Sequence, residues 1–293
     1  MQPKIGFIGF GEASFNISKG LTGEGLAVIR AYDKFWNVAP QSELIAHRAE
    51  EAKVTLTGSL QELIEKSDII ISSVSANMVL PLAKESAAFL QKGQIYVDIN
   101  SAGPDTKVAA NDIISSQALF VDVAVMGTVP GSGHKVPMLA SGAGAAFFVE
   151  TMKPYGMNLT LLDGPAGKSS ASKMFRSIFM KGFVTLMLET VIAGNKYGIE
   201  DDVLASIKET LTAGDFLTIV NGMLTRGVIH SERREHEMDE VIATLKSLDL
   251  DSTMSEATKA KLRWCTDMKF KEFFKGVPPK DFHEIFAALN KQG

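Results

Sequence analysis

Several features that mark particular protein classes are scarce in this chain. It has one cysteine, Cys265, among 293 residues, so it cannot form an intrachain disulfide and must gain its stability from a buried core. This is typical of a reducing compartment. It has no excess of basic residues, because 30 lysines and arginines stand against 34 aspartates and glutamates, a net charge of −4. A chain without a positive field does not attract phosphate backbones, and we expect no nucleic-acid partner.

Long hydrophobic runs and metal-ligand clusters are also missing from the sequence. The apolar stretch 136–149 is interrupted by Pro137 and Gly142 and is shorter than the roughly 20 residues that span a bilayer. The apolar start, residues 5–11, is followed at once by Glu12 and predicts a strand rather than a signal peptide. The five histidines show no metal-binding spacing. We therefore expect a cytoplasmic protein with no membrane partner and no metal.

The apolar pattern divides the chain near residue 165. Before it, short apolar runs alternate with helical segments, which predicts an α/β domain with a parallel sheet over residues 1–164. The expected strands are 4–9, 27–33, 68–74, 95–99, 119–125 and 158–162. After it, a 3.6-residue spacing predicts an all-helical domain over residues 165–293, joined to the first by a long helix. The expected helices are 170–197, 202–212, 216–225, 231–248, 253–275 and 279–290.

The long helix 170–197 is apolar around most of its circumference, which predicts burial between other elements. Its start is basic, because residues 164–188 contain four lysines and arginines and no acidic residue. Lys173, Ser177 and Lys181 are four residues apart and share one face. Such a face either carries solvated lysines at a domain rim or lines a cleft for an anionic substrate.

A glycine-rich turn connects the first expected strand to a helical segment. Residues 9–14 read Gly-Phe-Gly-Glu-Ala-Ser, which matches the Gly-x-Gly-x-x-Gly turn of Rossmann-like dinucleotide-binding domains except at Ser14. The first glycine makes the tight turn, the second lets the backbone approach the diphosphate, and the helix N-terminus offers free N–H groups. Serine is small enough for the third position. The residues predicted to bind the cofactor here are Gly9, Phe10, Gly11, Glu12 and Ala13.

The choice between NAD and NADP depends on the end of the second expected strand. Asp33 stands there, 33 − 14 = 19 residues after Ser14. A carboxylate at this distance accepts hydrogen bonds from the adenosine ribose and repels a 2′-phosphate, which favours NAD(H). Lys34 is adjacent to Asp33 and is positively charged, so NADP(H) remains the alternative cofactor.

Three further motifs follow in order: 97–104 (Val-Asp-Ile-Asn-Ser-Ala-Gly-Pro), 122–128 (Asp-Val-Ala-Val-Met-Gly-Thr), and 164–167 (Gly-Pro-Ala-Gly) leading to Lys173. With the glycine-rich turn, they resemble the β-hydroxyacid dehydrogenase family, which includes 3-hydroxyisobutyrate dehydrogenase and the NAD-binding domain of 6-phosphogluconate dehydrogenase. The resemblance covers nearly the whole chain. It is closest to a divergent, 6-phosphogluconate dehydrogenase-like branch with an uncharacterised C-terminal domain.

This resemblance implies roles for particular residues. Lys173 would be the general acid/base, and Asn100 and Ser101 would lie near the nicotinamide and the substrate. Gly127 and Thr128 would donate hydrogen bonds to a substrate carboxylate. The remaining residues that we assign to the substrate are Met126, Arg176 and Ser177, and those that we assign to the cofactor are Val74, Ser75, Asn100 and His236.

The sequence departs from the family pattern at three of these positions. Met126 stands where the family has a serine, and Arg176 stands where it has an asparagine. His236 replaces a lysine on the cofactor side, and it is either a solvated helix residue or a residue lining the cofactor cleft. We hypothesise that Arg176 acts as an anion anchor, because a guanidinium can clamp a carboxylate or phosphate.

The predicted chemistry is hydride transfer between a β-hydroxy acid and a nicotinamide cofactor. Neutral Lys173 would take the hydroxyl proton, which requires a lowered pKa; desolvation and the neighbouring Arg176 and Lys181 would act in that direction. No tyrosine is followed by lysine four residues later, which disfavours the short-chain dehydrogenase type. Two alternatives remain: an imine reductase, a related enzyme that commonly lacks the lysine, and an inactive NAD-binding regulator.

The C-terminal segment is rich in phenylalanine, with five between residues 270 and 286. Packing in the core of the domain can account for them, but the family usually forms dimers through its helical domain. We therefore predict a homodimer.

Overall fold

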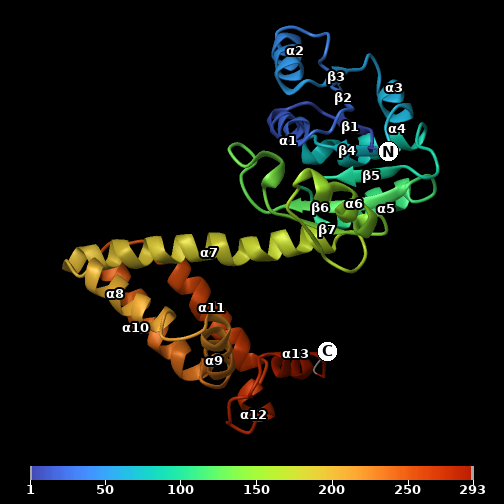
Figure 1. Ribbon diagram of the computed structural model, residues 1–293. Helices are drawn as coiled ribbons and strands as arrows, with labels where there is room; N and C mark the ends of the chain where they lie inside the picture. Colours follow the sequence, from blue (N-terminus) through green and yellow to red (C-terminus); the bar gives the residue numbers. More distant parts are fainter. Residues whose placement is uncertain (1, 292–293) are drawn as a thin grey trace. The chain divides into compact units, whose positions relative to one another are not determined.

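The computed structural model describes residues 2–291 and contains two compact units (Figure 1). The first unit ends at Ile178 and the second begins at Phe179. The division falls inside a single helix, α7 (Lys168–Tyr197). Each unit has a hydrophobic core of its own.

The first unit is built on one eight-stranded sheet with the strand order β3-β2-β1-β4-β5-β6-β7-β8. Neighbouring strands are parallel except β6 and β7, which are antiparallel. The strands are β1 (Ile5–Ile8), β2 (Ile29–Tyr32), β3 (Thr55–Leu56), β4 (Ile69–Ser72), β5 (Ile95–Asp98), β6 (Leu119–Val125), β7 (Met138–Ser141) and β8 (Leu159–Leu161). Strands β1, β4 and β5 are buried along their whole length, as their consecutive apolar residues predict, although β4 ends in Ser72 and β5 ends in Asp98.

Helices cover both faces of this sheet. Side chains of α1, α2 and α6 pack into a core on one face, and side chains of α3, α4 and α5 pack into a core on the other. The bounds are α1 (Glu12–Gly23), α2 (Gln41–Ala52), α3 (Leu60–Glu65), α4 (Val79–Ala87), α5 (Pro104–Ile114) and α6 (Ala145–Met152), with short 3₁₀ turns η1 (Ala76–Met78), η2 (Gly133–Lys135) and η3 (Lys153–Tyr155). Because β1 lies between β2 and β4, the chain order reverses at β1, and the carboxyl ends there open a crevice suited to a nucleotide.

The α/β prediction is confirmed, and all six expected strands are present within two residues of their predicted ends. Two strands were not predicted. Strand β3 has only two residues, too few for a periodic pattern. Strand β7 follows β6 without a crossover helix, through a segment that contains only η2. A chain that returns without such a crossover pairs antiparallel, so the sheet is predominantly rather than wholly parallel.

The second unit is helical, as predicted. Its helices after α7 are α8 (Glu200–Leu211), α9 (Phe216–Ile229), α10 (Ser231–Ser247), α11 (Thr253–Asp267), α12 (Phe270–Phe273) and α13 (His283–Asn290). Its core joins α9, α12 and α13 through Val228, Ile229, Phe270, Ile285 and Ala288. The predicted helix 253–275 is wrong in its length: it is broken at Lys269, which has a left-handed backbone (φ 50°).

Helix α7 differs from its prediction in burial. Phe175 is 66% exposed and Ile178 is 73% exposed, so the apolar surface expected to be buried is open in the single chain. An 18-residue window of α7 has a mean hydropathy of 1.4, and 6% of it is buried. By length and composition alone α7 is a candidate membrane span, although charged residues such as Lys173, Lys181 and Glu189 interrupt its apolar sequence.

Candidate functional site

The glycine-rich turn has the geometry that an anion-binding loop needs. Gly9 has φ 83°, and a Cβ atom there would lie 2.3 Å from the Ser73 carbonyl oxygen, so only glycine fits. A Cβ at Gly11 would meet no atom within 4 Å, which leaves the approach to the loop open. Gly11 is also the N-cap of α1, and no side chain caps that end. The free N–H groups of α1 therefore suit a diphosphate.

Ser14, which replaces the third glycine of the motif, has a role of its own in the turn. Its side chain is fully buried, and its hydroxyl donates a 2.6 Å hydrogen bond to the Gly9 carbonyl oxygen. The serine therefore closes the loop from inside, and the departure from glycine leaves the loop intact.

A cavity of about 380 Å³ runs from this turn to the end of β2. Gly9 and Gly11 line it near the turn, and Asp33 lines it at the strand end. The Asp33 carboxylate accepts N–H groups from Phe10 (2.8 Å) and Phe35 (3.0 Å), which ties the turn to the loop after β2. The Phe10 side chain is buried in the core, so only the backbone of this residue faces the predicted cofactor site.

A second cavity, of about 360 Å³, contains the predicted catalytic lysine. Asn100, Ser101, Gly127 and Lys173 line it, and Ser73–Ser75 line both cavities. The two cavities therefore adjoin along the segment after β4. An extended dinucleotide that enters through the first can reach the second.

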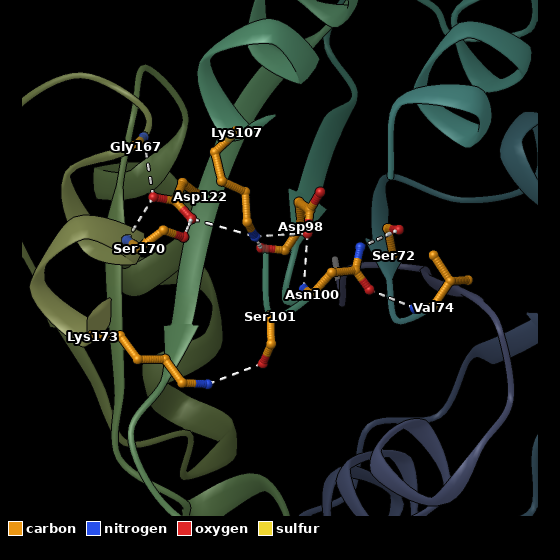
Figure 2. A network of polar contacts seen from close by, with 10 residues as sticks. All are labelled: Ser72, Val74, Asp98, Asn100, Ser101, Lys107, Asp122, Gly167, Ser170 and Lys173. Atoms are coloured by element: carbon orange, nitrogen blue, oxygen red, sulfur yellow. Dashed lines mark hydrogen bonds and ion pairs between the residues drawn. The ribbon is translucent and has the colours of Figure 1, made fainter. Parts of the chain in front are cut away.

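Lys173 is placed for proton transfer. It is half-buried on α7, and its Nζ lies 3.1 Å from the Ser101 hydroxyl oxygen (Figure 2). Burial lowers the pKa of Lys173 below its ordinary value, and the positive charge of Lys107 lowers it further. The cation that lowers the pKa of Lys173 is therefore Lys107. The prediction had assigned this effect to Arg176 and Lys181.

Lys107 belongs to a buried ionic cluster at the end of β5 and the middle of β6. Its Nζ lies 2.7 Å from Oδ1 of Asp98 and 3.4 Å from Oδ1 of Asp122, and all three side chains are at most 1% exposed (Figure 2). It also donates to the Asp98 carbonyl oxygen at 2.9 Å. An ammonium with this many partners is held in one position.

Asp122 holds the beginning of α7. Its carboxylate accepts the N–H groups of Gly167 (3.1 Å) and Ser170 (3.0 Å) and the Ser170 hydroxyl (2.6 Å). Ser141 on β7 accepts the Ser169 N–H at 3.0 Å. These are groups that a helix N-terminus leaves without intrahelical partners, so two strands cap α7 from the sheet. Lys173 lies one turn beyond this anchor.

Asp98 holds the opposite side of the cavity. Its Oδ1 accepts the N–H of Asn100 at 2.8 Å. The Asn100 side chain accepts the N–H of Val74 and donates to the Ser72 hydroxyl at 3.0 Å (Figure 2). Asn100 therefore ties the end of β5 to the end of β4. One buried cluster thus fixes both Lys173 and the Asn100–Ser101 segment.

The cluster was not predicted, although its members carried a signal. Asp98 and Asp122 end or interrupt buried apolar strands, where a carboxylate needs a partner. Lys107 is spaced by three and seven residues from the buried Ala110 and Ile114, so it lies on the buried face of α5. A lysine on such a face indicates an internal ion pair.

The other predicted residues make different contacts, line a cavity or are exposed. The Met126 N–H donates to the Pro137 carbonyl oxygen at 2.8 Å, and the Ser177 hydroxyl donates to the Lys173 carbonyl oxygen at 3.0 Å. Glu12, Thr128, Arg176 and His236 are exposed. His236 lies on α10 in the second unit. Ala13, Val74 and Ser75 line the second cavity.

Two family profiles match the sequence. One, described as an NADP oxidoreductase, coenzyme F420-dependent, matches residues 4–102, and one, described as a domain of unknown function (DUF1932), matches residues 195–265. An uncharacterized 28.5 kDa protein of Methanothermus fervidus is 30% identical over 256 residues, which cover 87% of this chain and 96% of that protein.

Two solved structures extend the comparison. A conserved protein of unknown function, described as structurally similar to 3-hydroxyacid dehydrogenases, is 30% identical with a TM-score of 0.63, over 94% of this chain and 99% of that one. An imine reductase from Aspergillus terreus in complex with NADPH4 and dibenz[c,e]azepine has a TM-score of 0.74 over 96% of this chain and 97% of that one. Its identity is 14%, so it shows the shared fold alone.

Proposed function

Because the chain belongs to the β-hydroxyacid dehydrogenase family and is an NAD(P)-binding oxidoreductase, we propose that it transfers hydride between a nicotinamide cofactor and a β-hydroxy acid. Its substrate in the other direction is the semialdehyde or keto form. The observation that carries the proposal is the half-buried Lys173 beside Ser101, in a cavity adjoining the cofactor cavity. Residues 1–164 bind the dinucleotide, and residues 165–293 serve substrate binding and dimerisation.

The proposed mechanism assigns the proton to Lys173. When bound, the nicotinamide supplies the hydride acceptor for oxidation and the donor for reduction. Neutral Lys173 removes the hydroxyl proton of the substrate, and its ammonium returns that proton in the reverse direction. Ser101 holds the lysine Nζ, and Asn100 is fixed beside it by Asp98. Gly127 in the cavity wall, with Thr128 next to it, offers donors to the substrate carboxylate.

The lowered pKa of Lys173 sets the pH dependence of the reaction. Oxidation needs the neutral amine, so kcat/KM for the hydroxy acid is expected to rise with pH through the lysine pKa. Its midpoint should lie below the value of about 10.4 of an ordinary lysine. Reduction needs the ammonium and should fall over the same range. Initial rates in both directions measure this, and a midpoint at or above the ordinary value would contradict it.

Arg176 is proposed as the anion anchor of the substrate. It is exposed on α7, three residues beyond Lys173. An Arg176→Ala variant is expected to raise the KM of the acid about tenfold, since a charge-assisted hydrogen bond contributes about 1.5–3 kcal/mol. Lys196→Ala, which removes a charge near the far end of the same helix, serves as the control. Unchanged KM and kcat in Arg176→Ala would exclude the anchor.

The exposed apolar surface of the helices is proposed to form a homodimer. In the second unit Val184 is 62% exposed and Leu217 is 70% exposed. Light scattering at micromolar concentration is expected to give twice the chain mass of 31.6 kDa. Val184→Glu should shift the mass toward one chain, because it buries a charge in the interface, whereas Lys196→Glu at an exposed polar position should not. A wild-type mass of a single chain would contradict the homodimer.

The proposed function is tested by initial rates of nicotinamide absorbance. The substrates are a panel of β-hydroxy acids and semialdehydes, including phosphorylated and dicarboxylic members, each with both cofactors. Turnover of at least one acid supports the proposal. Cofactor binding without turnover of any acid would contradict it, and a panel of imines and amines would then separate a reductase from an inactive regulator.

A further inference from the structure

The lining of the cofactor cavity carries an unbalanced negative charge. Of the thirteen residues that line this cavity, Asp33 and Glu85 are acidic and Lys34 is basic, which leaves a net charge of −1. Asp33 follows β2, whereas Glu85 is on α4, fifty-two residues later in the chain (85 − 33 = 52). The fold therefore adds a second carboxylate that the sequence motif around Asp33 does not contain.

Tyr32 lines the same cavity as both carboxylates. Burial raises the pKa of the Tyr32 hydroxyl, and the negative charges of Glu85 and Asp33 raise it further. Both charges therefore act on one side chain, which also lines the cavity.

The two carboxylates differ in their partners. Each oxygen of Asp33 already accepts a backbone N–H, from Phe10 or from Phe35. Within residues 2–291, the Glu85 side chain makes neither a hydrogen bond nor an ion pair, and the residue is exposed. Lys34 lies over the Phe35 ring, with its Nζ 4.7 Å from the ring centre. Lys34 is the one cation among the described residues that line this cavity, and it forms no ion pair with Glu85.

We propose that Glu85 is a second specificity determinant, beside Asp33, that disfavours the 2′-phosphate of NADP(H). A phosphate monoester carries about −1.5 to −2 charges near pH 7, and the corresponding position of NAD(H) is an uncharged hydroxyl. The repulsion therefore acts on one cofactor and leaves the other unaffected. The inference rests on the proposed preference for NAD(H), and it requires no assumption about the acid substrate.

Direct binding of NADH and NADPH to the full chain tests this role. The fluorescence of the reduced nicotinamide gives a Kd for each cofactor without turnover. In Glu85→Gln, the Kd for NADPH is expected to fall about fivefold and the Kd for NADH to change less than about twofold. Glu150→Gln removes the same charge from an exposed position on α6 and should change neither. Circular dichroism confirms that each variant is folded.

Lys34 provides a test of opposite sign. Lys34→Gln should raise the Kd for NADPH and leave the Kd for NADH nearly unchanged, because it removes the one cation among the described residues that line the cavity. The effects of both variants should shrink as salt is raised, since exposed charges are screened.

Two results would overturn the role of Glu85. One is a ratio of the two Kd values that Glu85→Gln leaves unchanged, or changes no more than Glu150→Gln does. The other is an equal change for both cofactors, which would place Glu85 at the part of the ligand that they share. A wild-type chain that prefers NADPH would instead contradict the NAD(H) preference, while the change caused by Glu85→Gln would still decide this residue's role.

Discussion

Replacing Lys173 by methionine is expected to lower kcat/KM about a thousandfold, because general acid/base catalysis contributes about 10² to 10⁴ in rate. Methionine keeps much of the length and the packing of the lysine but cannot carry a proton. The Kd for NADH should stay within about twofold, since Lys173 lines the second cavity and not the one that contains the glycine-rich turn. Initial rates and cofactor fluorescence on the same samples measure the two effects separately.

Lys173→Arg is the matched control for charge. Arginine keeps the positive charge but does not lose its proton in proteins, so it should be nearly as inactive as methionine if proton transfer is the role. Recovery of most of the activity by arginine would show that Lys173 acts as a fixed cation instead. A fully active Lys173→Met would remove it from the mechanism.

The second large effect is expected on stability. Lys107→Met leaves Asp98 and Asp122 buried without their cation, and removing one partner of a buried ion pair costs about 3–5 kcal/mol of the free energy of unfolding. Lys66→Met is the control, since Lys66 pairs with Glu62 on the surface and such pairs contribute about 1 kcal/mol or less. Urea denaturation followed by circular dichroism gives both values.

A compensated variant separates charge from packing. In Lys107→Met with Asp98→Asn and Asp122→Asn, no buried charge is left, and part of the lost stability should return. Equal losses in Lys107→Met and Lys66→Met would contradict the buried cluster. A triple variant with a lower free energy of unfolding than Lys107→Met alone would also contradict the buried cluster, because removing the two unpaired carboxylates should stabilise the chain.

The sequence predicted those elements of the fold that have a regular apolar pattern. Strands such as β1 and β4 have apolar residues at consecutive positions because helices cover both of their faces, and this pattern can be read directly from the sequence. Strand β3, with two residues, has no period to detect. The break of the predicted helix 253–275 at Lys269 could not be read either, because lysine is a common residue inside helices.

The candidate site was predictable only where chemistry follows a local motif. The glycine-rich turn depends on residues adjacent in sequence, and its geometry could be anticipated from Gly9 and Gly11. The Lys107 cluster joins α5 to two strands and to the start of α7, and Glu85 comes to the cavity from α4. Contacts of this kind depend on tertiary packing, to which a single sequence gives no direct access.

The measurement that tests the central claim most directly is the transfer of the carbinol hydrogen. A β-hydroxy acid that the chain turns over is deuterated at the carbinol carbon and incubated with NAD⁺, and the nicotinamide product is analysed by mass spectrometry. Hydride transfer with Lys173 as the base predicts deuterium in the nicotinamide ring for the wild type and about a thousandfold slower labelling for Lys173→Met. Reduced cofactor that carries no deuterium, or equal labelling by both proteins, would contradict the account.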